Sequence, residues 1–96
     1  MDKNTAIHLL SESKPLLQER VGVVRLALFG STARGSASDT SDIDILVAFD
    51  SPATFRRYFG VQFYLKNLLG RPVDLVTKKA LRPELRPYIQ RDLISV

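Results

Sequence analysis

Three short apolar segments constrain the fold of this 96-residue chain more than any other feature. They are rich in Val, Leu and Ile, and they occupy residues 21–30, 43–49 and 71–77. Runs of this composition are typical of buried β-strands. The segments around them carry apolar residues three or four positions apart, a spacing that is typical of helices packed on a sheet. This alternation predicts an α/β or α+β fold, with a mixed sheet of about four strands flanked by helices.

Two long segments are predicted to form the main helices. Residues 3–20 form the first, and Pro15 is expected to divide it into two pieces because proline lacks a backbone N–H. Residues 51–69 form the second, with Ser51 as its cap. We expect most aromatic side chains of the second helix to pack in the core or against other helices, and these are Phe55, Tyr58, Phe59, Phe63 and Tyr64.

The remaining segments are shorter. A helical turn that ends at Gly35 and a polar loop over residues 36–41 are expected to join the first two strands. Residues 78–92 are predicted to form a basic helical segment that prolines interrupt, and residues 93–96 a short last strand.

Length and composition limit the class of protein. Ninety-six residues suffice for one small domain with one modest core. The chain has no cysteine, which excludes disulfides and thiolate metal sites and suits a reducing compartment. The N-terminal residues lack the apolar core of a signal peptide, and no apolar run approaches the roughly 18 residues of a membrane span. We therefore expect a cytoplasmic protein.

Charge is distributed unevenly along the chain. Residues 1–55 contain 5 Lys and Arg against 7 Asp and Glu, whereas residues 56–96 contain 9 against 3. A basic half can bind nucleic acid, an acidic protein or a polyphosphate, or it can simply be a solvated surface. Charge alone favours the solvated surface. If the half is a docking surface instead, its candidate residues are Lys78, Lys79, Arg82, Arg86 and Arg91.

Three aspartates interrupt the apolar strand segments. Asp42 and Asp44 lie two residues apart, so they project to the same face of a strand, and Asp74 lies inside another strand. A buried carboxylate is costly unless it is paired or binds a metal, and Mg²⁺ prefers carboxylate and phosphate oxygens. Asp42 could instead cap the start of a strand, and Asp44 or Asp74 could form an ion pair with Arg25, Arg71 or Lys78. The trio together indicates a metal site for phosphoryl or nucleotidyl transfer.

The loop before these acids offers contacts for an anion. Gly30 and Ser31 follow a strand and lead into a helical turn, so backbone N–H groups and a hydroxyl can face a phosphate. Arg34 lies three residues after Ser31, on the same face of such a turn, and can add a charge-assisted contact. A Gly-Ser pair alone most often marks only a turn, and no Walker A loop is present. The significance of the pair lies in its spacing to the acids.

This spacing resembles a known signature. Gly30 and Ser31 are followed by ten residues and then by Asp42-Ile43-Asp44, with a third Asp in a later strand. The pattern resembles that of the DNA polymerase β-like nucleotidyltransferase superfamily. The stretch LFGSTARGSASDTSDIDILVAF is most similar to the minimal nucleotidyltransferase (MNT) subfamily, which includes the MntA-type antitoxins that accompany HEPN toxins. The similarity continues through residues 64–89, so residues 1–96 are expected to form one minimal nucleotidyltransferase domain.

The resemblance implies a role for each motif residue. The nucleotide-binding residues would be Gly30, Ser31, Arg34 and Ser41. The catalytic and metal-binding residues would be Asp42, Asp44 and Asp74. Of these, Gly30 and Ser31 would bind the β- and γ-phosphates of ATP. Asp42 and Asp44 would coordinate two Mg²⁺ ions, and Asp74 would help to activate the acceptor hydroxyl.

The resemblance also implies a partner. Family members usually transfer AMP from ATP, and the antitoxins modify a tyrosine of a HEPN toxin. The motif-bearing segments leave no room for a second domain, so the acceptor is expected from a docked HEPN-type toxin or from another chain of a homo- or hetero-oligomer. The leading hypothesis is an Mg²⁺-dependent enzyme that adenylylates such a toxin and acts as its antitoxin.

Three other hypotheses remain open. The domain could neutralise a toxin by binding alone, although the intact acids argue against a decayed site. It could be the catalytic subunit of a small-molecule nucleotidyltransferase, for example one acting on an aminoglycoside, although it has no acceptor domain of its own. Nucleic-acid binding through the basic half lacks a recognisable motif and ranks last.

Overall fold

The chain folds into alternating helices and strands, as a computed structural model shows for residues 1–37 and 41–96. The elements are α1 (Lys3–Val21), β1 (Val23–Phe29), α2 (Gly30–Arg34), β2 (Ile43–Phe49), α3 (Phe55–Leu69), β3 (Val73–Thr77), the 3-10 turn η1 (Pro83–Leu85), α4 (Arg86–Asp92) and β4 (Ile94–Ser95). The predicted order of elements is therefore confirmed. Part of the loop predicted over residues 36–41 lies outside the described residues.

The four strands form one mixed sheet in the order β3-β2-β1-β4. β1 pairs antiparallel with both β2 and β4, and β2 pairs parallel with β3. In this register Asp44 of β2 lies opposite Phe29 of β1 on one side and opposite Asp74 of β3 on the other. The mixed sheet of four strands is thus as predicted, and it brings two of the predicted site residues side by side.

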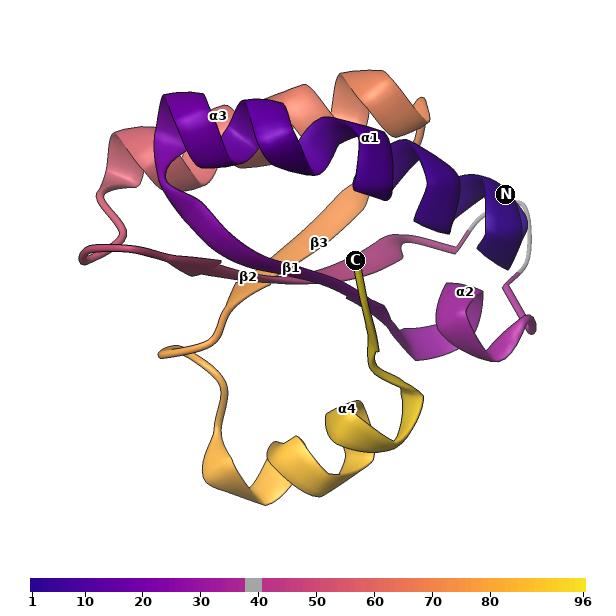
Figure 1. Ribbon diagram of the computed structural model, residues 1–96. Helices are drawn as coiled ribbons and strands as arrows, with labels where there is room; N and C mark the ends of the chain where they lie inside the picture. Colours follow the sequence, from indigo (N-terminus) through magenta and orange to yellow (C-terminus); the bar gives the residue numbers. More distant parts are fainter. Residues whose placement is uncertain (38–40) are drawn as a thin grey trace.

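Helices α1 and α3 cover one face of the sheet, which we call the upper face (Figure 1). Strand side chains that point to this face are fully buried, and examples are Leu26, Leu28 and Ile45. They pack against Leu10 of α1 and Leu65 of α3 in the main hydrophobic core. Burial of one such side chain contributes about 1.5–3 kcal/mol, so this layer supplies most of the stability of the fold.

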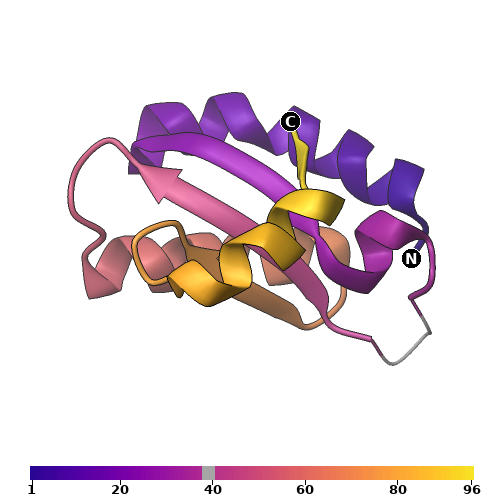
Figure 2. The ribbon, with the colours of Figure 1, turned by 90° about the horizontal axis from the view of Figure 1, so that it is seen from below.

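The opposite, lower face carries a smaller apolar cluster. Ala27, Phe29 and Leu46 are buried there, and Ile89 and Leu93 of the C-terminal segment pack against them. Figure 2, which looks onto this face, shows α4 lying across the strands. One short helix therefore covers only part of the lower face.

Helix α1 differs from the prediction, because it continues unbroken through Pro15. Pro15 is exposed, whereas Leu10 before it and Leu17 after it are buried in the same core. Packing on both sides of the proline offsets the missing backbone hydrogen bond and holds the two halves in one helix. No helix of the described chain is long and apolar enough to cross a membrane.

Helix α3 begins at Phe55, later than predicted. The hydroxyl of Thr54, rather than that of Ser51, caps it by accepting the backbone N–H of Arg57 at 3.2 Å. Its buried stripe is aliphatic and consists of Val61, Leu65 and Leu69. The expectation that its aromatic side chains pack was therefore wrong for three of them, which are exposed: Phe55, Phe59 and Phe63.

Candidate active site

Asp44 and Asp74 meet on the lower face of the sheet. Parallel pairing of β2 with β3 puts them opposite each other, and the alternation of side chains along β2 points Asp44 to the same side as Leu46. Burial raises the pKa of the Asp44 carboxyl to about 6, and the charge of Asp74 and a hydrogen bond with its carboxyl act in the same direction. The charge of Asp42 adds to the shift, whereas Arg34 opposes it. The site thus concentrates negative charge.

These carboxylates are not ordinary ion-pair partners. Among the described residues, the acids that pair with arginine are Asp50, which contacts Arg57 at 3.1 Å, and Asp92, which contacts Arg34 at 2.7 Å. Asp44 is half-buried, and the described ion pairs do not include it. A half-buried acid kept without a paired cation points to a ligand rather than to a structural role.

Gly30 lets the backbone come directly against the Asp44 carboxylate. Its φ is +75°, in the left-handed region that side chains rarely adopt, and a Cβ at this position would collide with Oδ2 of Asp44. Only glycine meets both conditions. The start of α2 and the carboxylate of β2 therefore form one site, although twelve residues of sequence separate the Gly-Ser pair from Asp44.

A cavity of about 520 Å³ opens at this junction. One wall comes from the end of β1 and from α2, with Gly30, Ser31 and Arg34, and Asp44 lines it from β2. The opposite wall comes from α4, whose lining residues are Tyr88, Ile89, Arg91 and Asp92. Three predicted nucleotide-binding residues and one predicted catalytic acid therefore line the same space.

The contribution of α4 is what sequence reasoning missed. The Arg34 guanidinium donates to the Asp92 carboxylate at 2.7 Å, which ties α2 to α4 beside the cavity. The basic composition of the C-terminal segment predicted a docking surface or a solvated one. The last strand, which pairs with β1, returns this segment to the site. That strand was predicted, but its pairing with β1, which places α4 here, was not.

The other predicted site residues are close to Asp44, in sequence or across the sheet. Asp74 is exposed beside Asp44, and Asp42 is exposed immediately before β2 and acts on Asp44 through its charge. The backbone carbonyl of Ser41 accepts a hydrogen bond from Arg71 at 3.5 Å. None of these three is among the described residues that line the cavity. A ligand that reached them would have to extend out of the cavity.

A divalent cation fits the chemistry of this pair of acids. Asp44 and Asp74 offer the oxygen ligands that Mg²⁺ takes, and a cation would relieve the repulsion that adds to the effect of burial on the pKa of Asp44. Within residues 1–37 and 41–96, no three acidic or histidine side chains are arranged to hold one ion. Asp44 and Asp74 would therefore hold it together with phosphate oxygens and water. A ligand role for Asp42 stays a prediction.

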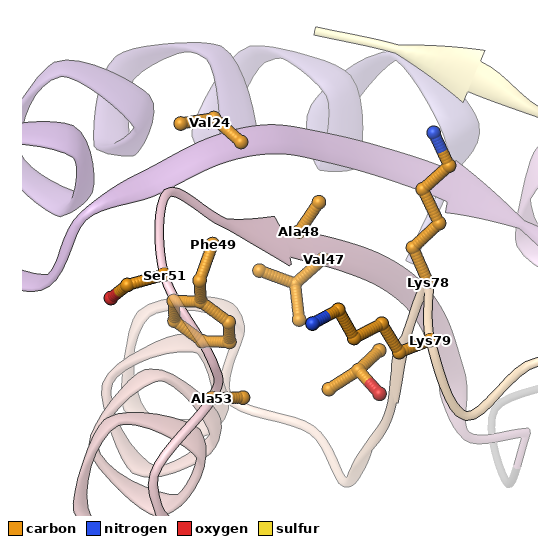
Figure 3. Close-up of a pocket in the computed structure, with 9 residues that line it drawn as sticks. Val24, Val47, Ala48, Phe49, Ser51, Ala53, Lys78 and Lys79 are labelled. Carbon is orange, nitrogen blue, oxygen red and sulfur yellow. The ribbon is translucent and has the colours of Figure 1, made fainter.

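A second cavity, of about 300 Å³, lies at the other end of β2. Figure 3 shows that its lining is largely apolar, with Val47 and Phe49, and that Lys79 reaches toward Val47 while Lys78 extends away from it. Acidic residues are absent from its described lining, so it cannot supply the ligands of a cation. The chemistry of transfer belongs to the cavity beside α2.

Comparison with known proteins decides the family. The nucleotidyltransferase domain family matches residues 10–96. The chain belongs to this family. A curated relative, the protein adenylyltransferase MntA of Thermococcus cleftensis, is 38% identical over 88 residues, which are 92% of this chain and 89% of the relative. The chain is accordingly a nucleotidyltransferase.

Solved structures agree with this assignment. A candidate minimal nucleotidyltransferase is 38% identical, with a TM-score of 0.85 over 100% of this nucleotidyltransferase and 97% of that chain. A chain from the complex of a tri-AMPylated Shewanella oneidensis HEPN toxin with its MNT antitoxin is 22% identical, with a TM-score of 0.60 over 97% and 66% of the two chains. The latter shows a shared fold. The predicted resemblance and fold class are confirmed.

Proposed function

We propose that this nucleotidyltransferase transfers AMP from ATP to a tyrosine hydroxyl of a partner HEPN toxin and thereby acts as its antitoxin. The observation that carries the proposal is the close approach of Gly30 to Asp44 in one cavity, with Asp74 opposite Asp44 on the neighbouring strand. The name of the Thermococcus cleftensis relative supports AMP as the transferred group. The AMPylated toxin in the Shewanella complex supports a HEPN partner.

In this proposal the start of α2 holds the triphosphate. The backbone N–H groups at Gly30 and Ser31, with the Ser31 hydroxyl, donate to oxygens of the β- and γ-phosphates. Arg34 exchanges its Asp92 partner for a phosphate and makes a charge-assisted contact. Ser41, three residues before Asp44, would be a further contact to the nucleotide. The triphosphate then extends from α2 toward the acids of β2 and β3.

The acids act at the α-phosphate. The acceptor oxygen bonds to the α-phosphorus, the bond from that phosphorus to the bridging oxygen breaks, and pyrophosphate leaves. Asp74 is exposed beside Asp44, where it can draw the proton from the acceptor hydroxyl. Mg²⁺ bound by Asp42, Asp44 and Asp74, two ions in this proposal, would offset the negative charge of acids and phosphates and polarise the α-phosphate.

The exposure of Asp74 also bears on the partner. This carboxylate faces solvent on β3, which forms an edge of the sheet. A side chain carried by another protein can therefore reach it without rearrangement of the core. A tyrosine on a docked partner meets this requirement.

The test is transfer of labelled AMP. The protein is incubated with α-labelled ATP, Mg²⁺ and the HEPN protein encoded beside it, and the label on each chain is measured. We expect label on the partner, and loss of at least about 100-fold in rate with Asp44→Asn, as for the removal of one essential electrostatic group. Asp50→Asn, which changes an exposed acid outside the cavity, is the matched control and should keep the rate.

Two outcomes would contradict the proposal. Equal labelling by the wild type and Asp44→Asn would show that the Asp44 carboxylate takes no part in the reaction. If Asp44→Asn and Asp42→Asn neutralise the toxin as well as the wild type does, the chain acts by binding alone.

A further inference from the structure

Tyr88 presents an aromatic ring to the cavity. The residue is 65% exposed, although it lines the cavity together with Gly30, Ser31 and Asp44. A ring this exposed gains little from burial in the free protein. A nucleotide base can stack on such a ring, and each base stacked on an aromatic side chain contributes measurably to binding.

The fold holds Tyr88 in a fixed relation to the phosphate loop. Ile89, the next residue, packs against the apolar cluster of the lower face. Asp92, one turn later, is tied to Arg34 of α2 at 2.7 Å. The helix that carries the ring is therefore anchored both to the sheet and to the element that begins at Gly30. Little ordering is needed before a ligand binds.

Charge next to the ring favours an anionic ligand. The guanidinium carbon of Arg91 lies over one face of the Tyr88 ring, 6.0 Å from its centroid, and Arg91 also lines the cavity. A cation beside an aromatic face suits a ligand that combines a flat ring with phosphates, and it disfavours a purely apolar one. The negative charge of Asp44 lies on another wall. The α4 wall, on which Asp92 is paired with Arg34, therefore offers a ring and a cation to a ligand that carries both a base and phosphates.

We propose that Tyr88 is the platform on which the base of the nucleotide stacks while Gly30 and Ser31 hold its phosphates. This inference rests on the proposed function. It divides the cavity into a phosphate end at α2 and a base end at α4. Stacking uses the flat face that every base has, so Tyr88 strengthens binding of a nucleotide without selecting one base.

The test separates the two ends with two ligands. Calorimetry on the full chain measures the Kd of Mg²⁺-ATP and of inorganic tripolyphosphate for the wild type, Tyr88→Ala and Tyr88→Phe. Tyr88→Ala should weaken ATP binding by about 5- to 150-fold, and should change tripolyphosphate binding by less than about twofold. Tyr88→Phe keeps the ring and should bind both ligands as the wild type does. Phe63→Ala is the matched control, since Phe63 is 69% exposed but lies on α3, outside the cavity.

Several outcomes would overturn the inference. ATP binding that is equal in Tyr88→Ala and the wild type would leave the ring without a role. Equal loss of ATP and tripolyphosphate would show an effect on the fold of α4 instead of stacking. A third outcome is that the chain labels itself with AMP. If Tyr88→Phe then loses this label, and Tyr88→Ala binds ATP with the Kd of the wild type, Tyr88 is an acceptor and not a platform. By contrast, Tyr88-dependent ATP binding without any labelled partner would defeat only the proposed function.

Discussion

In strand β2, Ile45 and Val47 point to the upper face and are fully buried under the long helices, whereas Asp44 points to the lower face and stays half-exposed. One strand therefore serves two purposes. The upper face is an apolar core that holds the sheet together, and the lower face places a carboxylate where its charge is costly. The difference teaches that the residues that stabilise the fold and the residues of the site lie on opposite faces of the sheet. Mutations on the upper face should therefore lower the free energy of unfolding, and removal of the charge on the lower face should raise it.

The upper face should show the largest loss of stability. Leu65→Ala removes a fully buried side chain from the core between α3 and the sheet, and we expect the free energy of unfolding to fall by about 2–5 kcal/mol. Chemical denaturation measures it. Phe63→Ala, two residues earlier on the exposed side of α3, should change the value by no more than about 0.5 kcal/mol. Equal losses in the two variants would mean that the buried stripe of α3 has been misassigned.

The contact between Gly30 and Asp44 can be isolated with a second glycine. Gly30 and Gly35 both have φ of +75°, but only Gly30 has Asp44 in the space of a Cβ. Gly35→Ala should cost about 1–2 kcal/mol of unfolding free energy, the strain of a left-handed residue. Gly30→Ala should cost more than that and should also abolish ATP binding. If the two variants lose similar amounts of unfolding free energy and both bind ATP, the close approach of Gly30 to Asp44 is not needed for ATP binding.

The lower face should gain stability when its charge is removed. The folded-state pKa of Asp44, about 6, lies above its usual value of 3.8, so the folded protein binds this proton more tightly than the unfolded chain does. Without divalent cations, stability should therefore decline as pH rises from about 4 to about 6. Asp44→Asn should remove much of this decline and raise the free energy of unfolding by about 1 kcal/mol at pH 7.5. This value is reduced because solvent screens a half-exposed group.

Thermal unfolding between pH 4 and pH 8 checks this prediction. Asp50→Asn, which alters an exposed acid paired with Arg57, is the control and should keep the decline. A wild type whose stability rises over the same interval would contradict the assigned environment of Asp44.

The smallest effect is expected at the link between α2 and α4. Asp92→Asn breaks a partly exposed ion pair with Arg34, so it should lower the free energy of unfolding by no more than about 1 kcal/mol. The same change frees Arg34 and removes a negative charge from the cavity, so tripolyphosphate should bind more tightly. Denaturation and calorimetry at low salt measure both. Weaker binding of tripolyphosphate would mean that Asp92 positions Arg34 for the phosphates.

Local patterns were enough to predict much of the fold. The predicted strand over residues 43–49 has the observed bounds of β2, because its Ile and Val side chains are buried on the upper face, Leu46 is buried on the lower face, and polar residues flank the strand. Gly35 ends α2 as predicted, in a left-handed conformation that glycine adopts readily. The apolar residues around Asp44 and Asp74 placed both in strands, and the parallel register of β2 and β3 shows that the two lie side by side.

What the sequence did not reveal depends on contacts between distant segments. An aromatic series and an aliphatic series both run along α3 at helical spacing, and only the packed structure shows that Leu65 is buried while Phe59 is exposed. Likewise, Tyr88 and Asp92 reach the cavity because β4 pairs with β1 and brings α4 under the sheet. No local pattern in residues 78–92 carries that information.

The most direct test of the division between the two faces is the thermal stability of the wild type and Asp44→Asn, each with and without Mg²⁺-ATP. Without ligand, the variant should be the more stable. With Mg²⁺-ATP at about 100 times its Kd, the wild type should gain about 2.7 kcal/mol and the variant far less, so that their order reverses. An equal gain in both proteins would contradict the claim that the lower face accepts a destabilising carboxylate in order to bind the nucleotide and its metal.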